Sequence, residues 1–167
     1  MPHFKRLGRM MNLKCIYEIP DAEIVVGPDE GFISAAFRKP FGFWQGESII
    51  SHAVLNPPLD LKAVYRHRSG DIYYALTERH FQLTMRQPME GRFFMEIDQQ
   101  CAIDPNCEGE VIVDESCGNP FPIHPTYTVD LPTALVIALE FVATARRSAV
   151  CNWRPHAAMN VDWEAYI

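Results

Sequence analysis

Cysteine and histidine are the residue types with the widest chemistry in this 167-residue sequence, which holds five of the former and six of the latter. Four of them follow the spacing C-x5-C-x9-C-x6-H: Cys101, Cys107, Cys117 and His124. Structural zinc sites usually begin with two ligands separated by about two to four residues, and this pattern lacks such a pair. We therefore expect reduced thiols without a bound metal.

A thiol enzyme would need a nucleophile and a base, and Cys117 with His124 is the most suggestive pair. Nucleophile and base normally meet through the fold, so their nearness along the chain carries little weight. The flanking sequences of known thiol proteases are also missing. A loop thiol is the simpler interpretation, and a small enzyme with a thiol or carboxylate site stays as an alternative.

Carboxylates could also do acid–base chemistry. Glu96 and Asp98 are two residues apart, so on a strand they would share a face and could form a pair. The ordered oxygen spacing of an EF-hand is absent, and so are the glycine-rich loops that bind phosphate. The sequence therefore predicts no catalytic residue and no cofactor.

Charge is distributed unevenly along the chain, whose net charge is −6. Residues 93–145 hold nine acids and no Lys or Arg. Seven of these acids fall between residues 96 and 115: Glu96, Asp98, Asp104, Glu108, Glu110, Asp114 and Glu115. A one-signed field repels nucleic acid and attracts basic protein surfaces. We expect these seven residues to bind a protein partner, the alternative being a solvated acidic face.

Length and hydropathy favour one domain. Hydrophobic residues make up 48% of the chain, enough for a core. No apolar run approaches the roughly 18 residues of a membrane span, and the basic N-terminus lacks a signal-peptide core. We expect a single cytoplasmic domain over residues 1–167, without a membrane partner, with a flexible arm at 1–12 and a tail at 154–167.

Short apolar runs bounded by Gly and Pro predict strands, and these strands must position the cysteines, histidines and acids named above. The expected strands are residues 13–19, 32–37, 48–55, 81–85, 93–97 and 111–113. Residues 61–67 and 72–77 flank a Ser-Gly-Asp turn and predict one hairpin. Residues 81–85 and 93–97 predict a second hairpin, and the Pro-rich residues 116–125 predict a loop.

Residues 131–147 predict an amphipathic helix. Asp130 can cap its first turn, and Pro132 is tolerated there. Apolar residues recur at helical spacing: Leu131, Ala134, Leu135, Ala138, Phe141, Val142 and Ala145. The fold class is therefore α+β, a mostly antiparallel sheet of short strands with this long helix packed on one face. A short segment, residues 149–153, follows the helix.

The C-terminal third resembles immunity proteins of bacterial polymorphic and contact-dependent toxin systems, mainly over residues 110–153. In that family the helix ends in a pattern like F-x-x-T-G-x-R-P, with a Trp about a dozen residues after the Phe. Four residues match: Phe141, Thr144, Arg147 and Trp153. Ala145 stands where the family often has Gly, and Ser148 stands where Pro is common.

The resemblance implies a protein that neutralises a cognate toxin domain, often a deaminase or nuclease, and has no catalytic residue of its own. Phe141, Leu135 and Trp153 would be packing residues. The acids of residues 96–115 would cover the toxin's basic cleft. Two alternatives remain: the small enzyme named above, and a chaperone or adaptor for a secreted effector.

Overall fold

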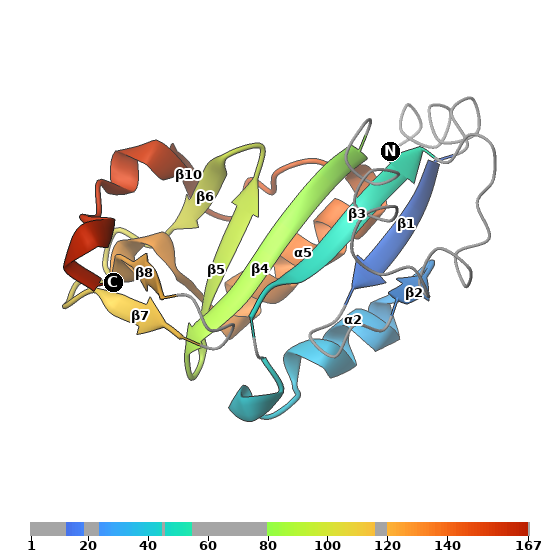
Figure 1. The fold of residues 1–167 in the computed structure, drawn as a ribbon. Helices are drawn as coiled ribbons and strands as arrows, with labels where there is room; N and C mark the ends of the chain where they lie inside the picture. Colours follow the sequence, from blue (N-terminus) through green and yellow to red (C-terminus); the bar gives the residue numbers. More distant parts are fainter. Residues whose placement is uncertain (1–12, 19–23, 45, 55–79, 116–119, 167) are drawn as a thin grey trace.

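The computed structural model describes residues 13–18, 24–44, 46–54, 80–115 and 120–166. The arm expected at residues 1–12 and the hairpin expected at 61–77 lie outside them. The described part combines a large antiparallel sheet, a small two-stranded sheet and helices packed against one face of the large sheet (Figure 1). The predicted α+β class is confirmed.

The large sheet is antiparallel throughout and has the order β10-β6-β5-β4-β3-β1-β2, with β9 pairing to β5. Its strands are β1 (Leu13–Glu18), β2 (Ile24–Val26), β3 (Ser48–Val54), β4 (His80–Met89), β5 (Arg92–Ile97), β6 (Gln100–Ile103), β9 (Val129–Asp130) and β10 (Asn152–Pro155). The strands expected at residues 13–19 and 48–55 correspond to β1 and β3. The β4–β5 hairpin is also confirmed, and its turn places Gly91 at a φ of +78°, a conformation that glycine adopts readily.

The small sheet pairs β7 (Ile112–Asp114) with β8 (Phe121–Ile123). β7 lies one residue later than the expected strand. β8 lies inside the segment expected to be a loop, so that prediction is wrong for these three residues. Pro122 opposes Val113 there, which is possible because every strand of a two-stranded sheet is an edge strand.

Helix α5 (Leu131–Thr144) begins where the sequence predicts and ends earlier. The Asp130 carboxylate accepts a hydrogen bond from the backbone N–H of Thr133 at 3.0 Å, which caps the first turn. The helix ends at Thr144 instead of Arg147 because Ala145 adopts a left-handed φ of +56°. Ala134, Ala138 and Phe141 are buried as expected, together with Ile137, whereas Leu135 and Val142 are only partly buried.

Helix α2 (Glu30–Phe37) replaces the strand expected at residues 32–37, and that prediction is wrong. The Asp29 carboxylate caps the helix by accepting from the Phe32 N–H at 2.7 Å. Ile33, Ala36 and Phe37 are buried, and their spacing of three and four residues fits one helical face. A short apolar run cannot be assigned to helix or strand by periodicity alone, so the cap and the tertiary contacts decide.

Two clusters of buried residues hold the described part together. The main core joins α2 and α5 to the large sheet and includes Phe37, Trp44, Phe93 and Phe141. The second core lies at the other end of the molecule and consists of Phe94, Cys101, Ile103, Ile123, Tyr127 and Met159. Figure 1 shows β7, β8 and the C-terminal segment gathered at that end, away from α2.

The C-terminal segment is more structured than the expected tail at residues 154–167. It completes β10 and continues into two short 3-10 helices, η3 (His156–Met159) and η4 (Trp163–Tyr166). Met159 is only 5% exposed because it fills the second core.

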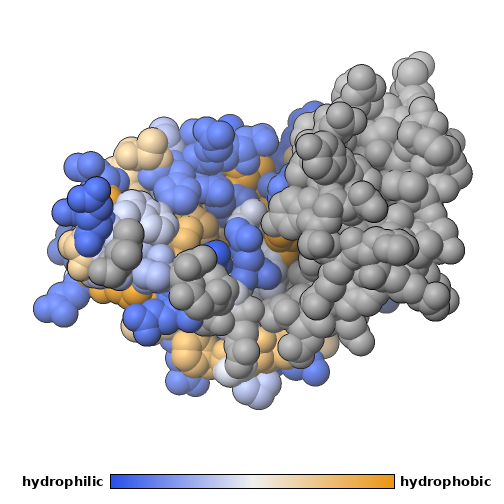
Figure 2. All heavy atoms as spheres, in the orientation of Figure 1, coloured by the Kyte–Doolittle hydropathy of each residue, from blue (hydrophilic) through white to orange (hydrophobic). Residues whose placement is uncertain are grey.

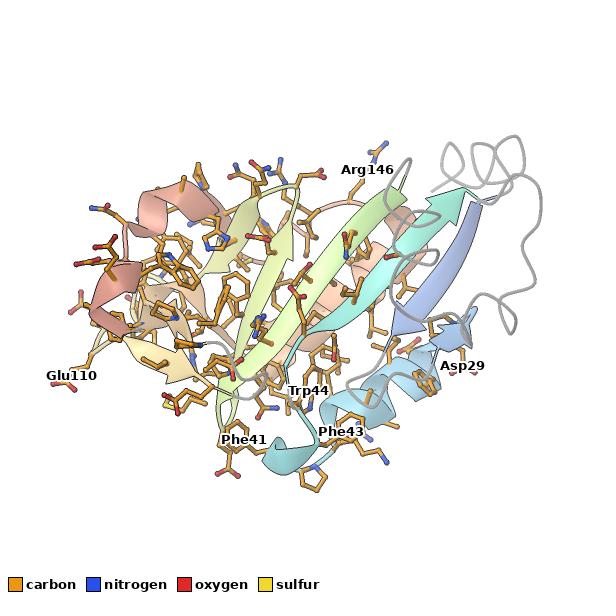
Figure 3. All side chains as sticks on the ribbon, in the orientation of Figure 1. Asp29, Phe41, Phe43, Trp44, Glu110 and Arg146 are labelled. Atoms are coloured by element: carbon orange, nitrogen blue, oxygen red, sulfur yellow. The ribbon has the colours of Figure 1, made fainter. Side chains whose placement is uncertain are left out.

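Two further 3-10 helices are η1 (Phe41–Phe43) and η2 (Pro125–Tyr127). Phe41 of η1 is exposed, and hydrophobic surface is visible at this lower edge of the molecule (Figures 2 and 3). Within the described residues, no helix has the length and apolar character needed to cross a membrane.

Candidate functional site

The seven acids proposed as a binding surface occupy three different environments. Asp114 is buried and pairs with Arg86 of β4, with 3.2 Å between Oδ2 and Nη1. The Arg86 guanidinium also lies 4.3 Å from the centre of the Phe121 ring. This ion pair joins the small sheet to the large one, so Asp114 has a structural role within the chain.

Asp104 is the second acid with an arginine partner. Its Oδ2 accepts from Nη2 of Arg92 at 3.1 Å, and the Asp104 side chain keeps 32% of its exposure. Arg92 also donates to the Thr128 hydroxyl and carbonyl oxygens, at 3.0 and 2.8 Å. Arg86 and Arg92 both precede residue 93, so a count restricted to residues 93–145 finds no cation. The fold nevertheless brings both arginines against acids of this segment.

The remaining acids except Glu96 are exposed: Asp98, Glu108, Glu110 and Glu115. Asp98 does not share a face with Glu96, because β5 ends at Ile97 and a two-residue turn follows. Asp98 and Gln99 both have a positive φ in that turn, as type I′ hairpins require. The other three flank β7, and Figure 3 shows Glu110 projecting from the end of the molecule where β7 lies.

Glu96 belongs to a cluster that the sequence did not predict, with Cys101 of β6 and His156 of η3. Glu96 and Cys101 oppose each other in the β5–β6 register because the two-residue turn brings positions five apart face to face. The backbone N–H of His156 donates to the Gln99 carbonyl at 2.8 Å, which fixes the start of η3 beside the hairpin. Each element thus contributes one side chain.

The Glu96 carboxylate stands at the centre of this cluster. Its Oε2 accepts from His156 Nδ1, and it lies 3.8 Å from the Cys101 sulfur, which donates to it. Hydrogen bonding to Glu96 raises the pKa of His156. Burial, with the negative charge of Glu96 as a smaller cause, raises the pKa of the Cys101 thiol.

A pocket of about 460 Å³ opens onto the cluster. It is lined by Glu96, Asp98, Gln99, Gln100, Pro155, His156 and Ala157. Cys101 is fully buried behind it. The Phe94 and Phe121 rings lie edge-on to the imidazole, with centroids 5.6 and 6.1 Å from it, and orient His156 toward the pocket side.

This arrangement disfavours thiol catalysis as it stands. A nucleophilic thiol needs access to its substrate and a lowered pKa, whereas Cys101 is fully buried, and burial, with Glu96 as a smaller cause, raises the pKa of its thiol. Carboxylate, thiol and imidazole are also three metal-binding groups, and their ligand atoms all lie within 4.8 Å of one another. Among the described residues this is the group of three that could hold an ion.

The C-x5-C-x9-C-x6-H pattern is not the origin of this cluster. Cys101 turns toward Glu96 and His156, whereas Cys107 is half-buried and His124 is exposed. Cys117 lies outside the described residues. Neither the turn at Asp98 and Gln99 nor strand β6 was predicted from the sequence, so no sequence pattern joined Glu96 to Cys101, and no local signal pointed to His156.

The residues expected to pack do so to different degrees. Phe141 is fully buried in the main core, and His52 of β3 donates from Nε2 to its carbonyl oxygen at 2.7 Å. Trp153 of β10 is partly buried against the main core and donates from its indole N–H to the Ser148 carbonyl at 2.8 Å. Leu135 lies at the margin of the same core.

Comparisons with known proteins identified no relative of this chain. No protein-family model matches the chain, and no significant match was found among curated proteins or solved structures.

Proposed function

We propose that this protein is an immunity protein that acts in the cytoplasm, where it binds and neutralises a cognate bacterial toxin domain acting on nucleic acid. It works by binding a protein partner and not by catalysis. Its working surface is the acidic end, defined as the exposed carboxylates around β7, β8 and η4: Glu108, Glu110, Glu115, Asp162 and Glu164.

The observation that carries the proposal is that Glu108, Glu110 and Glu115 have no cationic partner among the residues that the structure describes. None of the ion pairs formed between described residues includes Glu108, Glu110 or Glu115. The two arginines nearest in the sequence to these three acids, Arg86 and Arg92, already pair with Asp114 and Asp104. Hydrophilic side chains project from this end of the molecule (Figure 2). The surface therefore retains its negative potential.

An exposed aromatic side chain lies among these acids. Trp163 of η4 is 41% exposed, and its ring packs edge-on against Phe121 of β8 with 5.3 Å between centroids. Trp is enriched among the residues that contribute most to protein interfaces, usually surrounded by polar groups. Trp163 would supply the apolar contact and the acids around it the charge complementarity.

The refined surface differs from the seven acids of the sequence analysis. Glu96, Asp104 and Asp114 are engaged within the chain and would act indirectly, by holding β5, β6 and β7 in place. Asp98 is exposed in the turn of the β5–β6 hairpin, where it lines the pocket beside Glu96, and it does not belong to the acidic end. A toxin that binds nucleic acid presents a basic cleft, which these carboxylates would occupy in place of phosphates.

The test is co-expression with the product of the adjacent toxin gene, followed by co-purification and measurement of its deaminase or nuclease activity. The wild-type protein should inhibit this activity, with association that slows steeply as salt is added. Two single variants, Glu108→Lys and Glu110→Lys, each reverse one charge. Each should weaken binding at least tenfold, or about 1.4 kcal/mol.

Glu140→Lys is the matched control, because Glu140 is exposed on α5 and lies away from the acidic end. It changes net charge equally and should leave binding within about twofold, since distant exposed charges are screened. Equal effects of all three reversals would show that only overall charge matters. Co-purification without inhibition would instead favour the chaperone or adaptor alternative.

The pocket beside Glu96 and His156 keeps a small enzyme as the second candidate function. Its carboxylate and imidazole are part-exposed, and the raised pKa of His156 is a feature of many acid–base sites. An activity lost in His156→Gln but kept in Glu108→Lys would favour the enzyme over the binding protein.

A further inference from the structure

We propose that Glu96, Cys101 and His156 form a binding site for a single zinc ion, with one coordination position open to the adjacent pocket. The three side chains come from three elements, β5, β6 and η3, and converge at one end of the β5–β6 hairpin. A zinc ion at this place is compatible with toxin binding and does not require it.

The ligand chemistry selects the metal. One thiol, one imidazole and one carboxylate are the donor types that bind zinc, whereas calcium and magnesium prefer oxygen donors alone. A buried sulfur donor in particular favours a borderline-soft ion of the zinc type. Three protein ligands with a fourth position left for water is a common composition of zinc sites that face a cavity.

The spacing of the donor atoms fits such an ion after small movements. Zinc bonds of about 2.0–2.3 Å in a tetrahedron place donor atoms about 3.3–3.8 Å apart. The Cys101 sulfur and the Glu96 Oε2 atom are already 3.8 Å apart, and all three donor atoms lie within 4.8 Å. Glu96 and His156 would exchange their direct hydrogen bond for two bonds to the metal.

The surroundings provide both a rigid base and an entrance. Cys101 is fully buried in the second core and cannot swing away, whereas Glu96 and His156 line the pocket and can adjust. A divalent charge would also stabilise the thiolate that burial and Glu96 disfavour in the metal-free protein. The metal would join η3 to the β5–β6 hairpin and so hold the C-terminal segment on the second core.

The experiment uses the full-length protein, reduced and freed of metal with a chelator, then titrated with Co²⁺ and next with Zn²⁺. One equivalent of Co²⁺ should produce a sulfur-to-cobalt charge-transfer band and the strong visible bands of four-coordinate cobalt. Zn²⁺ should displace Co²⁺ and raise the thermal midpoint. No band at excess Co²⁺ would overturn the proposal.

The variants identify the ligands. Cys101→Ser should lose the charge-transfer band, and Glu96→Gln and His156→Gln should each weaken Zn²⁺ binding at least about tenfold. Cys107→Ser and His124→Gln are the controls, because these residues offer the same donors outside the cluster. Their Zn²⁺ affinity should stay within about twofold of the wild type.

If Cys101→Ser fails to fold, Glu96→Gln and His156→Gln still decide, since both residues border the pocket and tolerate polar replacements. Circular dichroism checks that these two variants are folded. Wild-type affinity in both would refute the site, as would a charge-transfer band that disappears in Cys107→Ser and persists in Cys101→Ser.

Discussion

The main core and the second core are stabilised by different interactions. Around the main core, apolar side chains of α2 and α5 cover the large sheet, and the Phe37, Trp44 and Phe93 rings lie 5.3–5.4 Å apart. Around the second core, polar side chains join one element to the next through the ion pairs Arg86–Asp114 and Arg92–Asp104 and the hydrogen bond between His156 and Glu96.

Because of this difference, the two ends of the molecule should respond differently to changes in pH. Apolar burial depends little on pH, whereas a charged pair is lost when either partner changes its protonation. The second core carries the pocket and adjoins the acidic end, so the candidate functional regions lie on the part held together by charge.

The largest effect on stability is expected for Phe141→Ala in the main core. Phe141 is fully buried, so its truncation removes transfer free energy and leaves a cavity, a loss of about 3–5 kcal/mol in the free energy of unfolding. Chemical denaturation measures it. Val136→Ala, at an exposed site on the same helix, should change stability by less than about 0.5 kcal/mol. Equal losses in both variants would contradict the packing assigned to α5.

Asp114→Asn should have a comparable or slightly smaller effect. It removes the negative charge from a buried ion pair with Arg86, which should destabilise the fold by about 3 kcal/mol. Asp104→Asn is the control, because the Asp104 side chain is more exposed than that of Asp114 and its pair with Arg92 should contribute less, about 1 kcal/mol. An Asp114→Asn variant with unchanged stability would show that the second core does not depend on the ion pair between Arg86 and Asp114.

Two histidines should respond to pH in opposite directions. Burial lowers the pKa of His52 in the main core, whereas the hydrogen bond to Glu96 raises the pKa of His156. The contribution of His52 is therefore present above its unfolded pKa of about 6.5 and is lost as pH falls below it. The contribution of His156 is present below about 6.5 and is lost as pH rises through its folded pKa.

Ring C–H resonances of the two histidines in the metal-free protein, followed by NMR across this pH range, measure both pKa values. His156→Gln assigns its resonance and should abolish the part of the stability that declines toward alkaline pH. If the pKa of His156 were lower than the pKa of His52, the contrast between the two cores would be wrong.

The smallest effect on folding is expected at the acidic end. Glu108 and Glu110 are exposed and take part in no ion pair with the other described residues. Reversing their charges should change the free energy of unfolding by less than about 0.5 kcal/mol, as thermal denaturation would check. A loss above about 1 kcal/mol would mean that these acids hold the fold, and their effect on partner binding would no longer be specific.

Local features of the sequence determined α5 and the β4–β5 hairpin. Asp130 caps the helix through Thr133, three residues away, and its apolar stripe repeats at helical spacing. Residues 81–85 and 93–97 are short runs rich in apolar residues on either side of a turn that contains glycine. Such elements depend on neighbours within a few residues, so their pattern is complete in the sequence.

Tertiary contacts, together with the local cap by Asp29, decided α2, and tertiary contacts alone assembled the site. The run at residues 32–37 is too short for periodicity to distinguish helix from strand, and its burial against the main core selects the helix. Arg86 meets Asp114 across 28 positions, and Glu96 meets His156 across 60. Charge pairing and ligand geometry depend on distance in space. The composition of residues 93–145 therefore predicted an acidic segment, but it could not tell which of its carboxylates pair within the chain and which stay exposed.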